Sequence, residues 1–201
     1  MKKNFFALAA LAVFGVSQAQ QFKFGPKAGL NISTLVGGDA SDDNKMLIGY
    51  HVGGVAEIKF GRFALQPEIQ YSRQGTQTDG GLKFGSGELT YDSKTRMDYL
   101  NLLIMARFYA FKGFSIEAGP QAGILLSAET EYKNTNKATQ KRDVKHYYDS
   151  TDFGINAGFG YDFSNGIFTG LRYTMGVLSI SEDMDFDVRS SVIGIYGGFK
   201  F

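Results

Sequence analysis

The chain has 201 residues, a formal net charge of +1 and many glycine and aromatic residues, with 26 Gly, 18 Phe and 11 Tyr. The nearly neutral charge gives no support to nucleic-acid binding, which normally comes with a basic excess. The sequence has no cysteine, which excludes disulfide bonds, a lipoprotein anchor and thiol catalysis.

The first 19 residues have the organisation of a secretory signal peptide. Two lysines and an apolar run over residues 5–16 precede Ser17-Gln18-Ala19, which places small residues three and one before a cleavage site. The apolar run is shorter than the roughly 20 residues that a membrane-spanning helix needs, so we prefer cleavage to a membrane anchor. We expect a signal peptide over 1–19 and one mature domain over 20–201. No later stretch approaches a spanning helix, so a membrane protein of this sequence would have to be a barrel.

The rest of the chain divides into eight segments in which side-chain character alternates with the two-residue period of a strand. They cover residues 22–36, 47–60, 63–78, 97–111, 114–132, 150–163, 167–181 and 189–201. The connections are alternately long and short. The long ones are 37–46, 79–96, 133–149 and 182–188, and the short ones are the glycine-bearing turns at 61–62, 112–113 and 164–166. This alternation is typical of outer-membrane barrels, with short turns toward the periplasm and long loops outside. We therefore predict an all-β fold, an eight-stranded antiparallel transmembrane up-and-down β-barrel, located in the cell outer membrane.

One face of each segment is apolar and the other carries glycines and charges. In the last segment the apolar parity holds Ile193, Ile195, Phe199 and Phe201. Glycine is concentrated on the opposite parity, and the interior of an eight-stranded barrel is barely wide enough for side chains. We therefore assign the glycine-and-charge face to the lumen and the apolar face to lipid. A soluble lipocalin-like barrel is the alternative, but its interior would have to hold too many rings.

Aromatic residues gather near the short turns and the chain end, as in an interfacial girdle. They are Phe60, Phe63, Phe111, Phe114, Phe163, Phe168, Phe199 and Phe201. We also take Phe199 and Phe201 to mark the terminal strand for the barrel-insertion machinery.

Six charged residues on the lumen parity lie at similar distances from the periplasmic rim. They are Lys27, Glu57, Glu68, Arg107, Glu117 and Arg172. Buried charges are costly unless paired, so three positive and three negative groups at one level predict a salt-bridge network that fills the lumen. The alternative is a proton or ion path.

The long loops carry charge clusters. The first and fourth loops are acidic, and both would lie where the first and last strands meet; their residues are Asp39, Asp42, Asp43, Glu182, Asp183, Asp185 and Asp187. Asp183, Asp185 and Asp187 are weak candidates for Ca²⁺ ligands, because the glycine and distal glutamate of an EF-hand are missing. A solvated acidic loop is the simpler interpretation.

The third loop is basic, with Lys133, Lys137, Lys141, Arg142, Lys145 and His146. Lipopolysaccharide phosphates would be a suitable counterpart. A solvated run of charge is the alternative.

Candidates for catalysis are few. The only histidines are His51, on the lumen parity, and His146, in a loop, and neither belongs to a recognisable nucleophile or metal motif. The glycines recur at strand spacing rather than before a helix, so no phosphate-binding loop is present. We expect no enzyme activity and no cofactor, with a lipid- or peptide-processing enzyme as the remote alternative.

Several short motifs carry a family resemblance. They are Gly25-Pro-Lys-Ala-Gly-Leu-Asn31, Leu65-Gln-Pro-Glu-Ile-Gln-Tyr71 with Gly75, Glu117-Ala-Gly-Pro-Gln121, Gly158-Phe-Gly-Tyr161 and Arg172-Tyr-Thr-Met-Gly176. In this order and spacing the chain resembles the PorT-family outer-membrane β-barrel domain of Gram-negative bacteria. The resemblance implies a small integral barrel without catalytic residues, and some members of that family look like accessory parts of a protein secretion system.

These observations favour a structural or surface-interaction protein with a packed polar lumen, whose partners are outer-membrane lipids including lipopolysaccharide. An accessory role in secretion or assembly is the main alternative. A passive small-solute channel is a third hypothesis, which the lumen charges disfavour.

Overall fold

The computed structural model describes residues 21–37, 44–84, 87–134, 139–178 and 189–201. The expected signal peptide lies outside these ranges. The described chain forms nine strands and one short 3-10 helix, η1 (Lys145–Tyr147). The strands are β1 (Gln21–Val36), β2 (Asn44–Phe60), β3 (Phe63–Phe84), β4 (Gly87–Phe111), β5 (Phe114–Asn134), β6 (Thr139–Asp143), β7 (Thr151–Asp162), β8 (Ile167–Gly176) and β9 (Arg189–Phe199). No helix in these ranges is long and apolar enough to cross a membrane.

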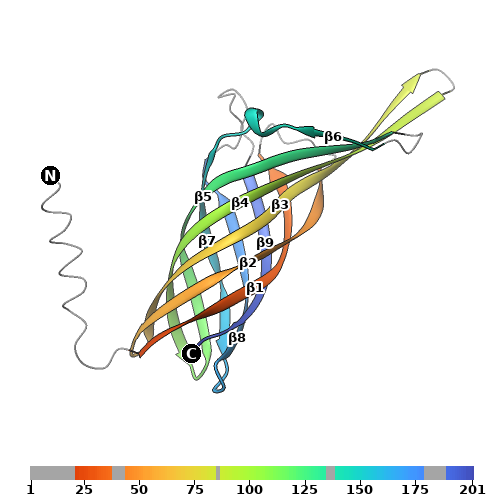
Figure 1. Cartoon of the computed structure of the whole chain (residues 1–201). Coiled ribbons are helices and arrows are strands. Elements are labelled where there is room, and N and C mark those ends of the chain that lie inside the picture. The colour runs from red at the N-terminus through yellow and green to blue at the C-terminus, as the bar shows by residue number, and fades with distance from the viewer. Residues whose placement is uncertain (1–20, 38–43, 85–86, 135–138, 179–188) are drawn as a thin grey trace, which may run out of the picture.

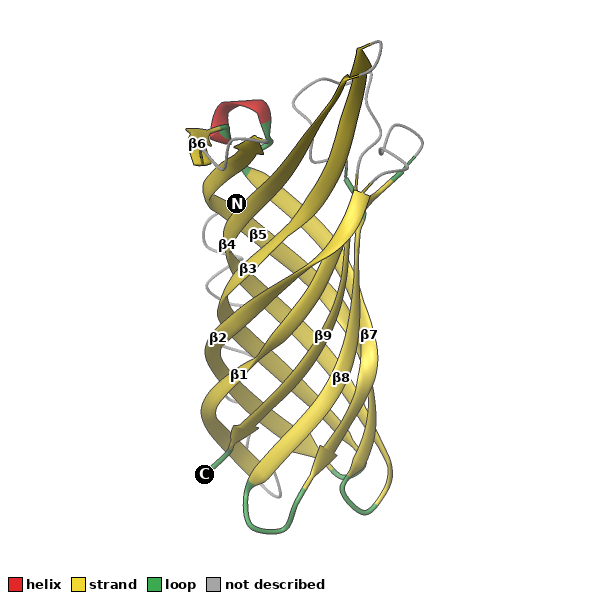
Figure 2. Cartoon of the chain, turned by 90° about the vertical axis from the view of Figure 1, so that its right-hand side faces the viewer, coloured by secondary structure: helices red, strands yellow, loops and turns green. Residues whose placement is uncertain are grey.

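Eight of the strands close into an antiparallel barrel (Figures 1 and 2). β1 to β5 and β7 to β9 pair in sequence, and β1 pairs with β9 to complete the ring. In that closing pair the register runs from Lys27 opposite Gly198 to Val36 opposite Arg189. The predicted eight-stranded antiparallel barrel is therefore confirmed.

The second long connection is not the loop that the sequence predicted. β3 and β4 remain paired as far as Phe84 opposite Gly87, whereas β2 accompanies β3 only to Asn44 opposite Thr78. The two strands therefore continue as a hairpin that projects past the barrel at the end away from the short turns (Figure 1). The prediction of a loop over 79–96 depended on the loss of apolar alternation. Outside a membrane, backbone pairing continues without an apolar face, so this loss did not mark the end of the strands.

The third long connection also contains regular structure. β6 pairs with the outer part of β5, with Thr139 opposite Lys133 and Asp143 opposite Glu129, and η1 follows it. The end of β8 also differs from the prediction. The strand ends at Gly176, and residues 177–178 form a bend instead of continuing the predicted strand.

Burial alternates along the strands as the barrel geometry requires. On β7, Ile155 is 59% exposed and the next residue, Asn156, is fully buried. The exposed parity carries the large apolar side chains that face lipid, and the buried parity faces the lumen. Several lumen glycines sit where the backbone of the next strand comes close: a Cβ at Gly119 would overlap the carbonyl oxygen of Ile104. These positions require glycine because a side chain has no room.

Most of the predicted girdle aromatics lie on the outer surface near the short turns. Phe111 and Phe114 stack with ring centroids 4.7 Å apart, and Phe199 and Phe201 meet at 5.3 Å. Phe168 is an exception and the prediction for it was wrong. It is 1% exposed, because β8 directs Ile167 to lipid and the next residue inward.

Candidate functional site

The six predicted lumen charges lie in one connected set of ion pairs, together with two charges that the sequence analysis did not include. Each barrel strand supplies one member, or in β9 the residue directly after the strand. The members are Lys27 (β1), Glu57 (β2), Glu68 (β3), Arg107 (β4), Glu117 (β5), Asp162 (β7), Arg172 (β8) and Lys200 (after β9). We call this set the ion-pair network. It is electrically neutral, with as many basic as acidic members.

One half of the network is centred on Glu68 and Arg172. The Arg172 guanidinium donates to both oxygens of Glu68, at 2.9 and 2.8 Å, and Lys27 Nζ donates to Glu68 Oε2 at 2.7 Å. Arg172 Nε also donates to Glu117 Oε1 at 2.8 Å. Tyr196 supports both signs of charge: its hydroxyl donates to Glu117 at 2.9 Å, and its ring centroid lies 4.0 Å from Lys27 Nζ. Bidentate arginine–carboxylate pairs of this kind are among the strongest hydrogen-bonded contacts.

The other half is centred on Arg107. Its Nη1 donates to Glu57 at 2.7 Å and its Nη2 donates to Asp162 at 3.0 Å. Lys200 Nζ bridges the same two carboxylates at 2.9 and 2.7 Å. The Tyr109 hydroxyl also lies between them, 2.7 Å from Glu57 and 2.8 Å from Asp162.

A single ion pair joins the halves, with Arg107 Nε 3.4 Å from Glu117 Oε2. All eight members except Asp162 have side chains no more than 6% exposed. Since a buried charge without a partner is costly, the pairing is what makes this cross-section of the barrel stable. The sequence missed Lys200 and Asp162 because they sit at strand ends, although both are on the lumen parity.

A second polar layer lies above the network, toward the projecting hairpin. His51 Nδ1 lies 2.8 Å from Asn31 Oδ1, and Asn31 Nδ2 donates to Ser72 at 2.9 Å. Gln70 and Gln121 face the same small cavity, whose volume is about 20 Å³. A cavity of this size has room for about one water molecule. His51 is therefore part of a packed layer of amide and hydroxyl groups.

An apolar cluster closes part of the mouth beyond this layer. Met97 and Tyr99 of β4 pack with Leu125 of β5, and Val144 and Tyr148 from the β6–η1 segment pack against them. The segment is fixed by backbone bonds, including Val144 N–H to Ala128 C=O at 3.0 Å. Burial raises the pKa of the Tyr148 hydroxyl. We call residues 139–148 the cap. The sequence predicted a loop for these residues. The signal that it missed was Val144, an aliphatic residue in an otherwise polar stretch.

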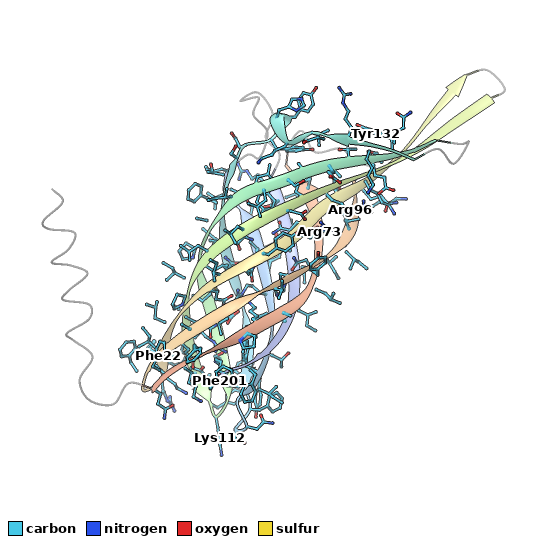
Figure 3. All side chains as sticks on the ribbon, viewed as in Figure 1. Phe22, Arg73, Arg96, Lys112, Tyr132 and Phe201 are labelled. Atoms are coloured by element: carbon cyan, nitrogen blue, oxygen red, sulfur yellow. The ribbon has the colours of Figure 1, made fainter. Side chains whose placement is uncertain are left out.

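Four of the basic residues predicted for the third connection lie on the outside of the cap, whereas Lys137 and the side chain of Lys133 lie outside the described part of the chain. Lys141, Arg142, Lys145 and His146 are all exposed, and Lys145 Nζ donates to the carbonyl of Leu126 at 3.1 Å. On the neighbouring outer face of the sheet, Arg73 forms two 2.7 Å hydrogen bonds to Asp98. Arg73 and Arg96 lie on the upper part of the barrel, toward the projecting hairpin (Figure 3).

The acidic loop residues proposed as Ca²⁺ ligands, Asp183, Asp185 and Asp187, lie outside the described residues, as do the other acidic residues of the first and fourth loops. Within the described ranges, no group of three or more His, Asp or Glu side chains is arranged to hold a metal ion.

Two solved structures are similar in fold. Neisserial surface protein A is 11% identical, with 92% of this chain and all of that chain covered and a TM-score of 0.55. The attachment invasion locus protein Ail of Yersinia pestis, in complex with the heparin analogue sucrose octasulfate, is 15% identical, with 90% and 99% covered and a TM-score of 0.50. A comparison with curated protein sequences finds no significant match.

The sequence itself places the chain in a family. Residues 18–182 match the model described as the outer membrane protein beta-barrel domain. This match agrees with the closed barrel, the apolar outer belt and the fold of the two similar structures. The chain therefore belongs to the outer membrane protein beta-barrel domain family and is a protein of the cell outer membrane.

Proposed function

We propose that this protein is a sealed, non-enzymatic outer-membrane barrel with a structural or surface-interaction role. The observation that carries the proposal is the ion-pair network, to which every barrel strand contributes a charge. In this network each of the eight charged side chains has an oppositely charged partner, which disfavours a role for these groups as a general acid, a base or a transport site.

Two further layers support a sealed lumen rather than a passive channel. The His51 layer leaves a cavity of only about 20 Å³, and the cap packs Val144 and Tyr148 into the mouth. An ion crossing the barrel would have to pass the ion-pair network and the His51 layer, and the cap narrows the mouth beyond them. The packed polar lumen is thus a scaffold that holds the outer elements in place.

The outer elements are the part suited to interaction. The β3–β4 hairpin extends beyond the last residue of β2, so it presents a strand pair outside the membrane. Lys141, Arg142 and Lys145 of the cap lie exposed at the same end of the barrel (Figure 1). Basic side chains at this height would attract the phosphates of lipopolysaccharide.

Photo-crosslinking in whole cells tests the surface role. A photoreactive residue at Lys83 or Glu88, which pair in the part of the hairpin beyond β2, should give crosslinked products with lipopolysaccharide or a surface protein. The same residue at Ser164, in a periplasmic turn, is the control. Identical products from both ends, or none from the hairpin, would contradict the surface role.

A second candidate follows from the resemblance to the PorT family, namely an accessory of a protein secretion or assembly system. Such a protein would act through partners at its loops or periplasmic turns. Recovery of secretion components with the barrel from gently solubilised membranes would favour this role. Phe199 and Phe201, exposed at the terminal strand, are the residues we propose the barrel-insertion machinery contacts.

A further inference from the structure

The lipid-facing surface has an apolar groove across β1, β2, β3 and β4. Its volume is about 650 Å³. Pro26, Gly54, Ala56 and Pro67 form its floor, and the exposed side chains of its walls are Phe24, Ile69, Leu102 and Phe201. The groove is concave because small or flat side chains replace the bulky aliphatic ones that cover most of the outer belt.

Gly54 shows that the barrel itself does not require this hollow. A Cβ at Gly54 would have only one neighbour, the carbonyl oxygen of Gly25 at 3.8 Å. The preceding residue, Gly53, is different, because a Cβ there would overlap the backbone of Ile69. Close packing within the chain therefore explains why the inward-facing residue 53 is glycine. Nothing in the chain requires a glycine at the outward-facing residue 54, so the space beside Gly54 is available to a molecule outside the protein.

The position of the groove indicates which leaflet would fill it. Along β3, Pro67 lies about 17 Å from Arg62 of the periplasmic turn, at roughly 3.3 Å per residue. Half of a hydrocarbon core about 30 Å thick is about 15 Å, and strand tilt shortens the rise, so the groove lies within the acyl layer of the periplasmic leaflet. Phe22 and Phe201 lie at the same end of the barrel as Lys112 (Figure 3).

The rim below the groove is basic. Apart from the members of the ion-pair network, the charged side chains of the described residues at this rim are Lys23, Lys59, Arg62 and Lys112. Lys59 lies over the Tyr109 ring inside the barrel, whereas Arg62 is exposed in the turn between β2 and β3, which supply three of the four floor residues of the groove. A lipid phosphate at this level would find positive side chains and no unpaired acidic one among them.

We propose that the groove seats one acyl chain of an anionic phospholipid of the periplasmic leaflet, with its phosphate at Arg62. The proposal depends on the location in the outer membrane and is independent of any surface partner. A second copy of the chain is a poorer occupant, because two-fold pairing through this face would bring two basic rims together.

Native mass spectrometry of the protein released from nanodiscs of mixed phosphatidylglycerol and phosphatidylethanolamine tests the proposal. The wild-type barrel should retain one phospholipid and select phosphatidylglycerol. Gly54→Leu and Ala56→Leu fill the groove and should lose the retained lipid. Ala118→Leu and Ala157→Leu add the same bulk as Ala56→Leu on the outer face of β5 and β7, away from the groove, and should retain it. Arg62→Gln should keep the lipid but lose the preference for phosphatidylglycerol.

Heat-modifiability on a gel establishes that each variant is folded, and two groove variants are used so that one misfolded protein does not decide the result. Equal lipid retention by wild type and the folded groove variants would overturn the proposal. So would a dimer that Gly54→Leu dissociates, which would assign the groove to a second copy.

Discussion

Arg107 and Glu117 form the one ion pair between the two halves of the ion-pair network in the described chain, with Nε and Oε2 3.4 Å apart. Gln66 also joins the halves, because it accepts a hydrogen bond from Arg107 Nη1 at 2.9 Å and donates one to Glu68 Oε1 at 2.8 Å. Each half is neutral by itself, with two basic and two acidic members. Arg107 therefore has two roles: it neutralises its own half, and it holds that half beside the other across the barrel.

Arg107→Leu should destabilise the barrel strongly. It leaves Glu57 and Asp162 to share Lys200 in a buried site, and removing one partner of a buried pair costs about 3–5 kcal/mol. Urea unfolding in lipid vesicles and heat-modifiability on a gel measure the change. Arg142→Leu, at an exposed position of the cap, is the matched control and should unfold like the wild type. Unchanged heat-modifiability of Arg107→Leu would count against the network.

The two cations on Glu68 should differ in importance. After Lys27→Met, Glu68 still has the two bonds from Arg172, so we expect a loss of about 1–3 kcal/mol. Arg172→Met weakens the pairing of both Glu68 and Glu117 and should cost about 3–5 kcal/mol. Unfolding free energies of the two variants in the same vesicles give the comparison. A larger loss of unfolding free energy for Lys27→Met than for Arg172→Met would show that Arg172 is not the more important partner of Glu68.

Gly119→Val and Gly54→Val test which face of the sheet points to the lumen and which to lipid. The first places methyl groups against the carbonyl of Ile104 and should cost more than the 1–3 kcal/mol typical of overpacking, because backbone would have to move. The second points into open space and should be tolerated. Folding yield into detergent micelles is the readout, and the reverse order would contradict the assignment of the two faces.

The cap should resist alkali until high pH. Burial raises the pKa of Tyr148 above its ordinary value of 10, so the neutral phenol is favoured while the cap is folded. Its contribution to stability is complete below the unfolded pKa and is lost as pH rises through the folded one. The difference in tyrosinate absorbance between the wild type and the Tyr148→Phe variant reports on Tyr148 alone, and it should appear only above pH 10. Titration of this residue at or below that value would mean that the cap is not docked.

Strand periodicity was sufficient to predict the barrel, because each membrane-crossing segment must bury one face and expose the other to lipid. Residue parity likewise identified six of the lumen charges, but the criterion of equal height left out Lys200 and Asp162. A long side chain at a strand end can extend back into the lumen, so its charged group lies further from the rim than its backbone position indicates. The prediction for Phe168 was wrong because it depended on closeness to a turn, whereas the residue has the lumen parity and its side chain points inward.

The parts outside the membrane were the least predictable. The β3–β4 hairpin and β6 have no lipid-facing side, and their pairing depends on backbone hydrogen bonds that leave no apolar pattern in the sequence. The cap depends on a few contacts between residues distant in sequence, such as Val144 and Met97, which only the closed barrel brings together.

Conductance across a planar lipid bilayer tests the sealed lumen most directly. If the lumen is sealed, purified wild-type barrel, inserted and shown to be folded, adds no steady current to that of the bare bilayer over a range of voltages. A steady, ohmic current from every inserted wild-type barrel would contradict it.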